Sequence, residues 1–116
     1  MKLGWMVAEP TLPKPAIKAL LNLALIGGDA LVRGGQLDIG AETNAGGVEI
    51  VVRADGPRIV LDPELRDALS GEGDLLAPRA AAAFLAHALV KQSGGTLQVS
   101  PPEADVLLFG ASFPRS

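Results

Sequence analysis

Two glycine pairs divide this chain into segments of different hydrophobic periodicity. The pairs at residues 34–35 and 94–95 each follow a stretch with helical spacing of apolar residues, and a β-like stretch follows each pair. Adjacent glycines destabilise a helix, because glycine loses the most backbone entropy when it is ordered. The sequence therefore predicts one helix over about residues 13–33 and a second from Pro78 to the later glycine pair.

Alternating segments bounded by turn residues predict a β-sheet. The predicted strands span residues 3–8, 36–42, 48–54, 96–100 and 105–110. The turn chemistry at residues 44–47 predicts an antiparallel hairpin. Asp62 and Pro63 suit the start of a short helix that ends at Leu69, and residues 58–61 either continue the sheet or form a connector. The order β-α-β-β-α-α-β-β predicts an α/β (α+β) two-layer sandwich, in which helices cover one face of a mixed, mostly antiparallel sheet.

The long helix over residues 13–33 is expected to be amphipathic. Its buried face is predicted from apolar residues spaced by three and four: Ile17, Leu20, Leu21, Ala24, Leu25, Gly28 and Leu31. The opposite edge then carries Lys14, Lys18, Asn22, Ile26, Asp29 and Arg33. This pattern predicts that one side of the helix packs against the sheet.

Composition limits the possible function classes. The chain has 116 residues, the size of one domain over 1–116, and its 48% hydrophobic and 20% charged residues exclude wholesale disorder. With no cysteine it has no disulfide or thiolate site and suits a reducing cytoplasm, and its net charge of −3 argues against nucleic-acid binding. No segment has the length of a membrane span or the pattern of a targeting signal, so we expect a soluble cytoplasmic domain.

Few residues are candidates for chemistry. The single histidine, His87, lies between two alanines and lacks a neighbouring carboxylate to orient it, so we predict no catalytic residue, no metal ligand and no bound cofactor. Arg53 and Arg58 flank the turn at residues 55–57, and further basic residues follow the first helix: Lys14, Lys18 and Arg33. These side chains either form a basic patch for an acidic partner or are a solvated charged face.

Several segments resemble the ATP-binding domain of bacterial histidine kinases, a Bergerat-type sandwich. The residues around Asn22-Leu23 resemble the first half of its N-box helix, and residues 78–99, a helix that ends in Gly94-Gly95 before a strand begins, resemble the segment that follows its second glycine box. The nucleotide-binding residues of that pattern are missing. Ile26 stands where a second asparagine would hold magnesium, residues 55–59 lack the second glycine of the adenine-reading box, and residues 76–81 contain none of the lid glycines. A side chain at such positions fills space that the backbone needs to approach phosphate.

This combination resembles the C-terminal domain of the ChpT-type histidine phosphotransferases, which are similar to histidine kinases without ATP binding. The resemblance rests on residues 3–5, 15–23, 31–35 and the helix that begins at Pro78. It implies a response-regulator receiver as partner, and a homodimer formed through an N-terminal helical hairpin that bears the phosphorylated histidine. Nothing before Trp5 supplies that hairpin, so the chain is expected to be the C-terminal domain alone.

The resemblance also gives the two arginines a role. Arg58, helped by Arg53, is expected to dock the acidic active face of a receiver, because arginine forms bidentate bonds with carboxylates. Two alternatives stay open: a residual ATP-binding histidine-kinase-like domain, and a stand-alone binding module of the same fold.

Overall fold

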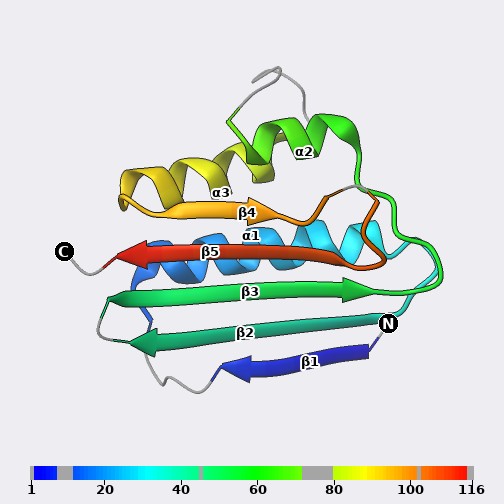
Figure 1. Cartoon of the computed structure of the whole chain (residues 1–116), viewed down its shortest axis with the longest axis horizontal. Coiled ribbons are helices and arrows are strands. Elements are labelled where there is room, and N and C mark those ends of the chain that lie inside the picture. The colour runs from blue at the N-terminus through cyan, green and yellow to red at the C-terminus, as the bar shows by residue number, and fades with distance from the viewer. Residues whose placement is uncertain (1, 8–11, 45, 72–79, 102, 115–116) are drawn as a thin grey trace.

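The computed structural model describes residues 2–7, 12–44, 46–71, 80–101 and 103–114. Its helices are α1 (Lys14–Ala30), α2 (Pro63–Leu69) and α3 (Ala81–Gln92), and its strands are β1 (Lys2–Val7), β2 (Gln36–Asn44), β3 (Gly47–Asp55), β4 (Thr96–Val99) and β5 (Leu107–Pro114) (Figure 1). The element order agrees with the predicted order.

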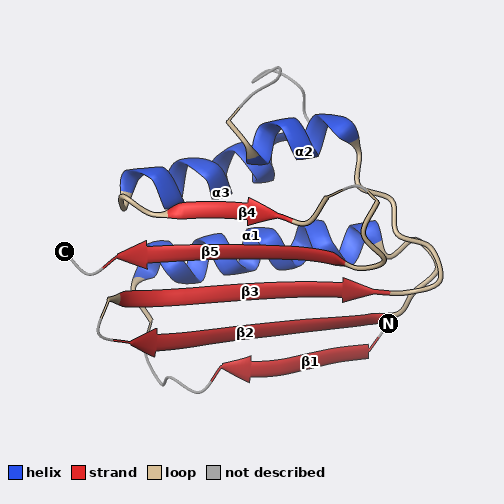
Figure 2. Cartoon of the chain, viewed as in Figure 1, coloured by secondary structure: helices blue, strands red, loops and turns tan. Residues whose placement is uncertain are grey.

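The strands form one sheet in the order β1-β2-β3-β5-β4. β1 runs parallel to β2, and the other pairs, β2 with β3, β3 with β5 and β4 with β5, are antiparallel. The helices lie on one side of this sheet (Figure 2). The predicted two-layer α+β sandwich with a mixed, mostly antiparallel sheet is confirmed.

The core lies between the sheet and the helices. Along β3, Val48, Ile50, Val52 and Ala54 are buried, whereas Glu49, Val51 and Arg53 between them are exposed. Because successive side chains of a strand point to opposite faces, the exposed set lies on the face that carries no helix. We call this the open face of the sheet.

The predicted buried face of α1 is correct for Leu20 and Leu31, which are buried, and wrong for three other residues. Ile17, Leu21 and Leu25 are 39%, 57% and 58% exposed, whereas Ile26, assigned to the opposite edge, is only 4% exposed. The buried residues of the helix are Ala16, Ala19, Leu20, Leu23, Ile26, Gly27 and Ala30. The physical reason is close packing: α1 lies against both the sheet and α3, and a Cβ on Gly27 would lie only 3.2 Å from side-chain atoms of Leu37 and Val52.

Small residues also dominate the buried side of α3. Its buried residues are Ala83, Ala86 and Val90, while the larger Leu85 is 48% exposed. Helices that present alanine can approach one another closely, because the interaxial distance depends on the side chains at the contact. The tight approach of α1 and α3 therefore depends on small side chains.

The C-terminal ends of two elements differ from prediction by three residues or more. α1 ends at Ala30 rather than Arg33, because the Ala30 carbonyl accepts a hydrogen bond of 2.9 Å from the Val60 N–H and Leu31 forms a β-bridge with Ile59. Residues 58–61 are thus a connector that pairs with the chain after α1. β5 runs to Pro114 rather than to residue 110, since β3 offers partners along its whole length, as far as Gly47.

Part of the predicted lid and loop region, residues 72–79, lies outside the described residues, as does the predicted helix start at Pro78. Among the described helices, none combines the length and the apolar character that crossing a membrane would require.

Candidate partner-binding site

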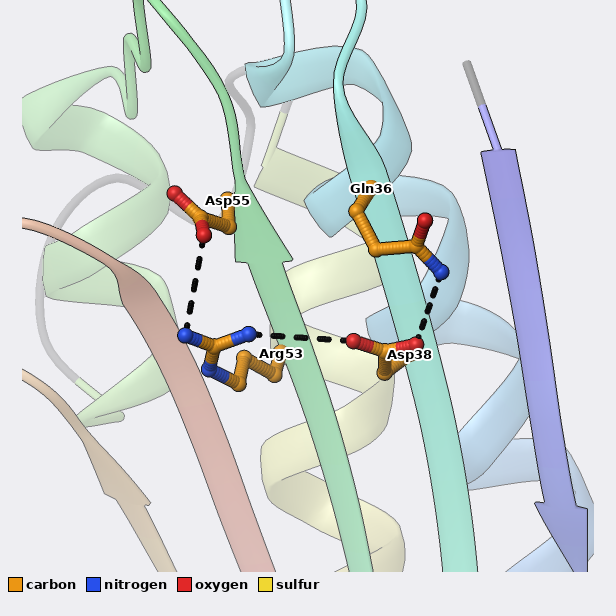
Figure 3. A network of polar contacts seen from close by, with 4 residues as sticks. All are labelled: Gln36, Asp38, Arg53 and Asp55. Carbon is orange, nitrogen blue, oxygen red and sulfur yellow. Dashed lines mark hydrogen bonds and ion pairs between the residues drawn. The ribbon is translucent and has the colours of Figure 1, made fainter.

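Arg53 is held on the open face by two carboxylates (Figure 3). Its Nη1 lies 3.7 Å from Oδ2 of Asp38 on β2, and its Nη2 lies 3.6 Å from Oδ2 of Asp55. Gln36 donates a 2.9 Å hydrogen bond from Nε2 to Oδ1 of Asp38. A side chain at Gly4 would clash with that same Oδ1, so the glycine on β1 makes room for the Asp38 carboxylate. The positive charge of Arg53 is therefore compensated within the protein.

Arg58 has a different setting, because it lies in the connector rather than on the sheet. Residues 30–34 and 56–60 run antiparallel to each other, as the Val60–Ala30 hydrogen bond and the Leu31–Ile59 bridge show. Arg58 is exposed, and no ion pair joins it to another described residue. Its guanidinium is available to a partner.

The paired segments also carry a second exposed arginine. Arg33 follows the bridged Leu31 by two residues, and Arg58 precedes the bridged Ile59 by one. Both arginines are exposed, as are the apolar side chains of Val32 and Val60. We call the group of Val32, Arg33, Arg58 and Val60 the arginine patch.

The other predicted basic residues do not join this patch. Lys18 lies twelve residues before the end of α1, which corresponds to about 18 Å along the helix axis, and Lys14 lies one turn farther. Arg53 lies on the open face of β3, where its guanidinium contacts Asp38 and Asp55. The structure thus places the segment that contains Arg58 beside the segment that contains Arg33, a residue that the sequence analysis grouped with the lysines of the first helix. Only the pairing of two segments far apart in the sequence reveals this.

The positions that resemble the kinase N-box have other roles here. Ile26 lies in the hydrophobic core with 4% of its surface exposed. The Nδ2 group of Asn22 donates a 2.8 Å hydrogen bond to the Lys18 carbonyl one turn earlier in its own helix. Ile26 therefore packs in the core, and the Asn22 side chain hydrogen-bonds to the backbone of its own helix.

The positions that resemble the adenine-reading box pack against backbone. Asp55 points to Arg53 on the open face, away from the helices. A Cβ on Gly56 would clash with the Gly34 carbonyl and lie 3.1 Å from Leu31 Cδ2. A Cβ on Gly35, which has φ of +138°, would likewise clash with the Asp55 carbonyl. These glycines allow two backbones to meet.

His87 contributes to structure in α3. Its Nδ1 lies 3.0 Å from the carbonyl oxygen of Leu69, the last residue of α2, and the ring is half-buried. A Cβ on Gly71, which has φ of +81°, would lie 2.5 Å from His87 Nε2. The imidazole therefore ties α3 to the end of α2. In the described part of the chain, no group of three or more His, Cys, Asp or Glu residues could hold a metal ion.

The fold and these positions define an ATPase-like sandwich of the histidine-kinase type. The profile of the family described as "Histidine phosphotransferase C-terminal domain" matches residues 1–105. The chain belongs to this family. No curated protein matches the sequence.

Solved structures agree with the family. A bacterial phosphotransferase superposes with a TM-score of 0.81 at 25% identity, over 96% of this chain and 55% of the other. The chain thus spans about half the length of that protein. The catalytic domain of histidine kinase ThkA gives a TM-score of 0.69 at 14% identity, over 97% of this chain and 77% of that one. AdeS, a histidine kinase of Acinetobacter baumannii, gives 0.64 at 16% identity, over 97% and 53%. The two kinases share the fold.

Proposed function

We propose that this chain is the C-terminal domain of a phosphorelay histidine phosphotransferase, where it helps to dock response-regulator receivers and binds no ATP. Residues 1–116 then form one ATPase-like domain with a degenerate nucleotide site. The longer protein dimerises through a preceding helical domain that bears the phosphorylated histidine. Its setting is the cytoplasm, in keeping with a chain that has no cysteine. The family match over residues 1–105 supports this proposal.

The observation that carries the docking role is the contrast between two arginines. Arg53 shares its charge with two carboxylates, whereas Arg58 and the neighbouring Arg33 are exposed beside two exposed valines. A receiver gathers carboxylates around magnesium and its phosphorylated aspartate, so its active face is acidic. Guanidinium groups suit such a face, and apolar side chains between them add contact area. Arg53 then contributes less than Arg58, because two carboxylates already compensate its charge.

A titration tests the docking role. The 116-residue chain is added to an isotopically labelled receiver domain with magnesium, and the receiver amide signals are followed by NMR. We expect shifts around the phosphorylatable aspartate that weaken as salt is raised, because salt screens exposed charges. Receiver signals that do not move at low salt, or that move only on the face away from this aspartate, contradict the docking role.

We also expect no binding of ATP or ADP with magnesium. Ile26 fills core space instead of offering an amide, and the Asp55 carboxylate faces Arg53 on the open face. Isothermal titration calorimetry should give no saturable heat, with an active histidine-kinase catalytic domain as the positive control. A micromolar dissociation constant would favour the residual kinase-like alternative.

A further inference from the structure

A cavity lies where the connector, α2 and the β4–β5 connection meet, at one end of the sheet (Figure 1). Its volume is about 410 Å³, within the range of sites for small molecules. Ile59, Leu61 and Pro63 line one wall, and Pro101 and Val106 line the other. Neither the Arg53 network nor the Asn22 and Ile26 positions contribute to it, whereas Val60 of the arginine patch also lines it, so the cavity adjoins that patch.

Hydrogen bonds fix both walls of this cavity. The Ser100 hydroxyl donates to the Val106 carbonyl (3.1 Å) and accepts from the Leu108 N–H (2.9 Å), and the Ala104 N–H donates to the Pro101 carbonyl (3.1 Å). In the opposite wall, the Val60 N–H donates a hydrogen bond to the carbonyl of Ala30, which does not line the cavity. A cavity that is formed before binding loses little conformational freedom when a ligand enters.

Arg66 of α2 is the charged residue of this lining, and its guanidinium has no anionic partner among the residues that the structure describes. Its Nη1 donates a 2.6 Å hydrogen bond to the Ser100 carbonyl, which uses one of five N–H donors. The side chain is part-buried, yet no carboxylate of the described residues forms an ion pair with it, in a protein of net charge −3. Arg53, which is more exposed, has two such partners. A part-buried guanidinium without a counter-charge favours an anion from outside the chain.

We propose that this cavity binds a small organic anion with an apolar body. The carboxylate or phosphate of the ligand meets the unused donors of Arg66, and its hydrocarbon part lies against Ile59, Pro101 and Val106. This binding goes beyond receiver docking and does not depend on it, because it can be measured on the 116-residue chain alone.

The test uses three probes that separate the two parts of the ligand. Hexanoate has both an apolar body and a carboxylate, hexanol has the body alone, and acetate has the anion alone. In NMR titrations of the labelled chain, we expect hexanoate to shift the amides of residues 59–61 and 104–107, with a dissociation constant on the order of 1 mM. Hexanol and acetate should bind about tenfold more weakly or not at all. Equal binding of hexanol and hexanoate would overturn the proposal.

Two variants and one control locate the site. Arg66→Met, which keeps an unbranched apolar side chain and removes the donors, should weaken hexanoate binding about tenfold or more. Ala104→Phe should block the cavity from its exposed rim without touching Arg66, so it keeps the proposal testable if Arg66→Met proves unstable. Arg33→Met removes the same charge from the arginine patch and should leave binding unchanged. Hexanoate binding that survives both cavity variants, or that is lost equally in Arg33→Met, would show that the anion binds elsewhere.

Discussion

Replacing Arg58 by glutamate in a full-length phosphotransferase that contains this domain should slow phosphotransfer from a phosphorylated receiver about tenfold. The substitution places a negative charge against an acidic surface, so association slows, and the deficit should shrink at high salt. Because Arg58 is exposed and without an ion pair among the described residues, the free energy of unfolding should change by less than about 0.5 kcal/mol. Phosphotransfer kinetics and thermal denaturation measure the two effects separately.

Lys18→Glu is the matched control for this experiment. The substitution makes the same change of charge at an exposed position of α1. Lys18 lies about 18 Å from the end of the helix that carries the arginine patch. The variant should therefore transfer phosphate at nearly the wild-type rate. Arg53→Ala should slow transfer less than Arg58→Glu, since Asp38 and Asp55 already compensate the Arg53 charge. If Lys18→Glu slowed phosphotransfer as much as Arg58→Glu, the effect would come from the net charge of the domain and not from the position of Arg58. Arg58→Glu that transfers at the wild-type rate but unfolds several degrees earlier would make Arg58 a structural residue.

Gly35→Ala should be strongly destabilising. At φ of +138° a side chain is strained, and here the new Cβ would also clash with the Asp55 carbonyl, a backbone atom that cannot rotate away. We expect a loss of about 3 kcal/mol or more, which for a chain of this length lowers the melting temperature by roughly 10 °C or more. Circular dichroism during thermal unfolding measures this change.

Gly110→Ala provides the comparison for that substitution. Gly110 lies on β5, and a Cβ there would have no heavy atom within 4 Å. Its melting temperature should stay within about 2–3 °C of the wild type. If Gly35→Ala melted together with Gly110→Ala and the wild type, the backbone contact between residues 34–35 and 55–56 would not stabilise the fold as described.

The order of elements could be predicted because its signals are local. Turn chemistry at residues 44–47 and glycines after each long helix act on their immediate neighbours, and the structure follows them. The buried face of α1 could not be predicted in this way. The helix has one stripe with Ile17, Leu21 and Leu25 and another of small residues with Leu23 and Ile26, and size alone favours the first. The second stripe is buried because both α3 and the sheet pack against it. This packing is a tertiary effect that the local sequence pattern does not contain.

The candidate site shows the same division. The sequence indicated that Arg58 follows a turn and is exposed, and the structure places it in an exposed connector. Its distance in sequence from Arg33 hides the fact that their segments run side by side. Of the two carboxylates that contact Arg53, only Asp55 is close to it in the sequence. The contact with Asp38 could not be predicted, because it depends on the register of β2 with β3.

The alanines of the helix layer have a consequence for conformational entropy. Alanine has no side-chain rotamers, so burying Ala16, Ala19, Ala83 and Ala86 restricts no side-chain freedom when the chain folds. Because alanine has no alternative rotamers, the helix layer also cannot adjust its packing by rotating side chains. A layer of leucines can absorb a new methyl group by rotating side chains, whereas a larger residue among these alanines must displace a whole helix. Small side chains therefore hold the helices α1 and α3 at one separation.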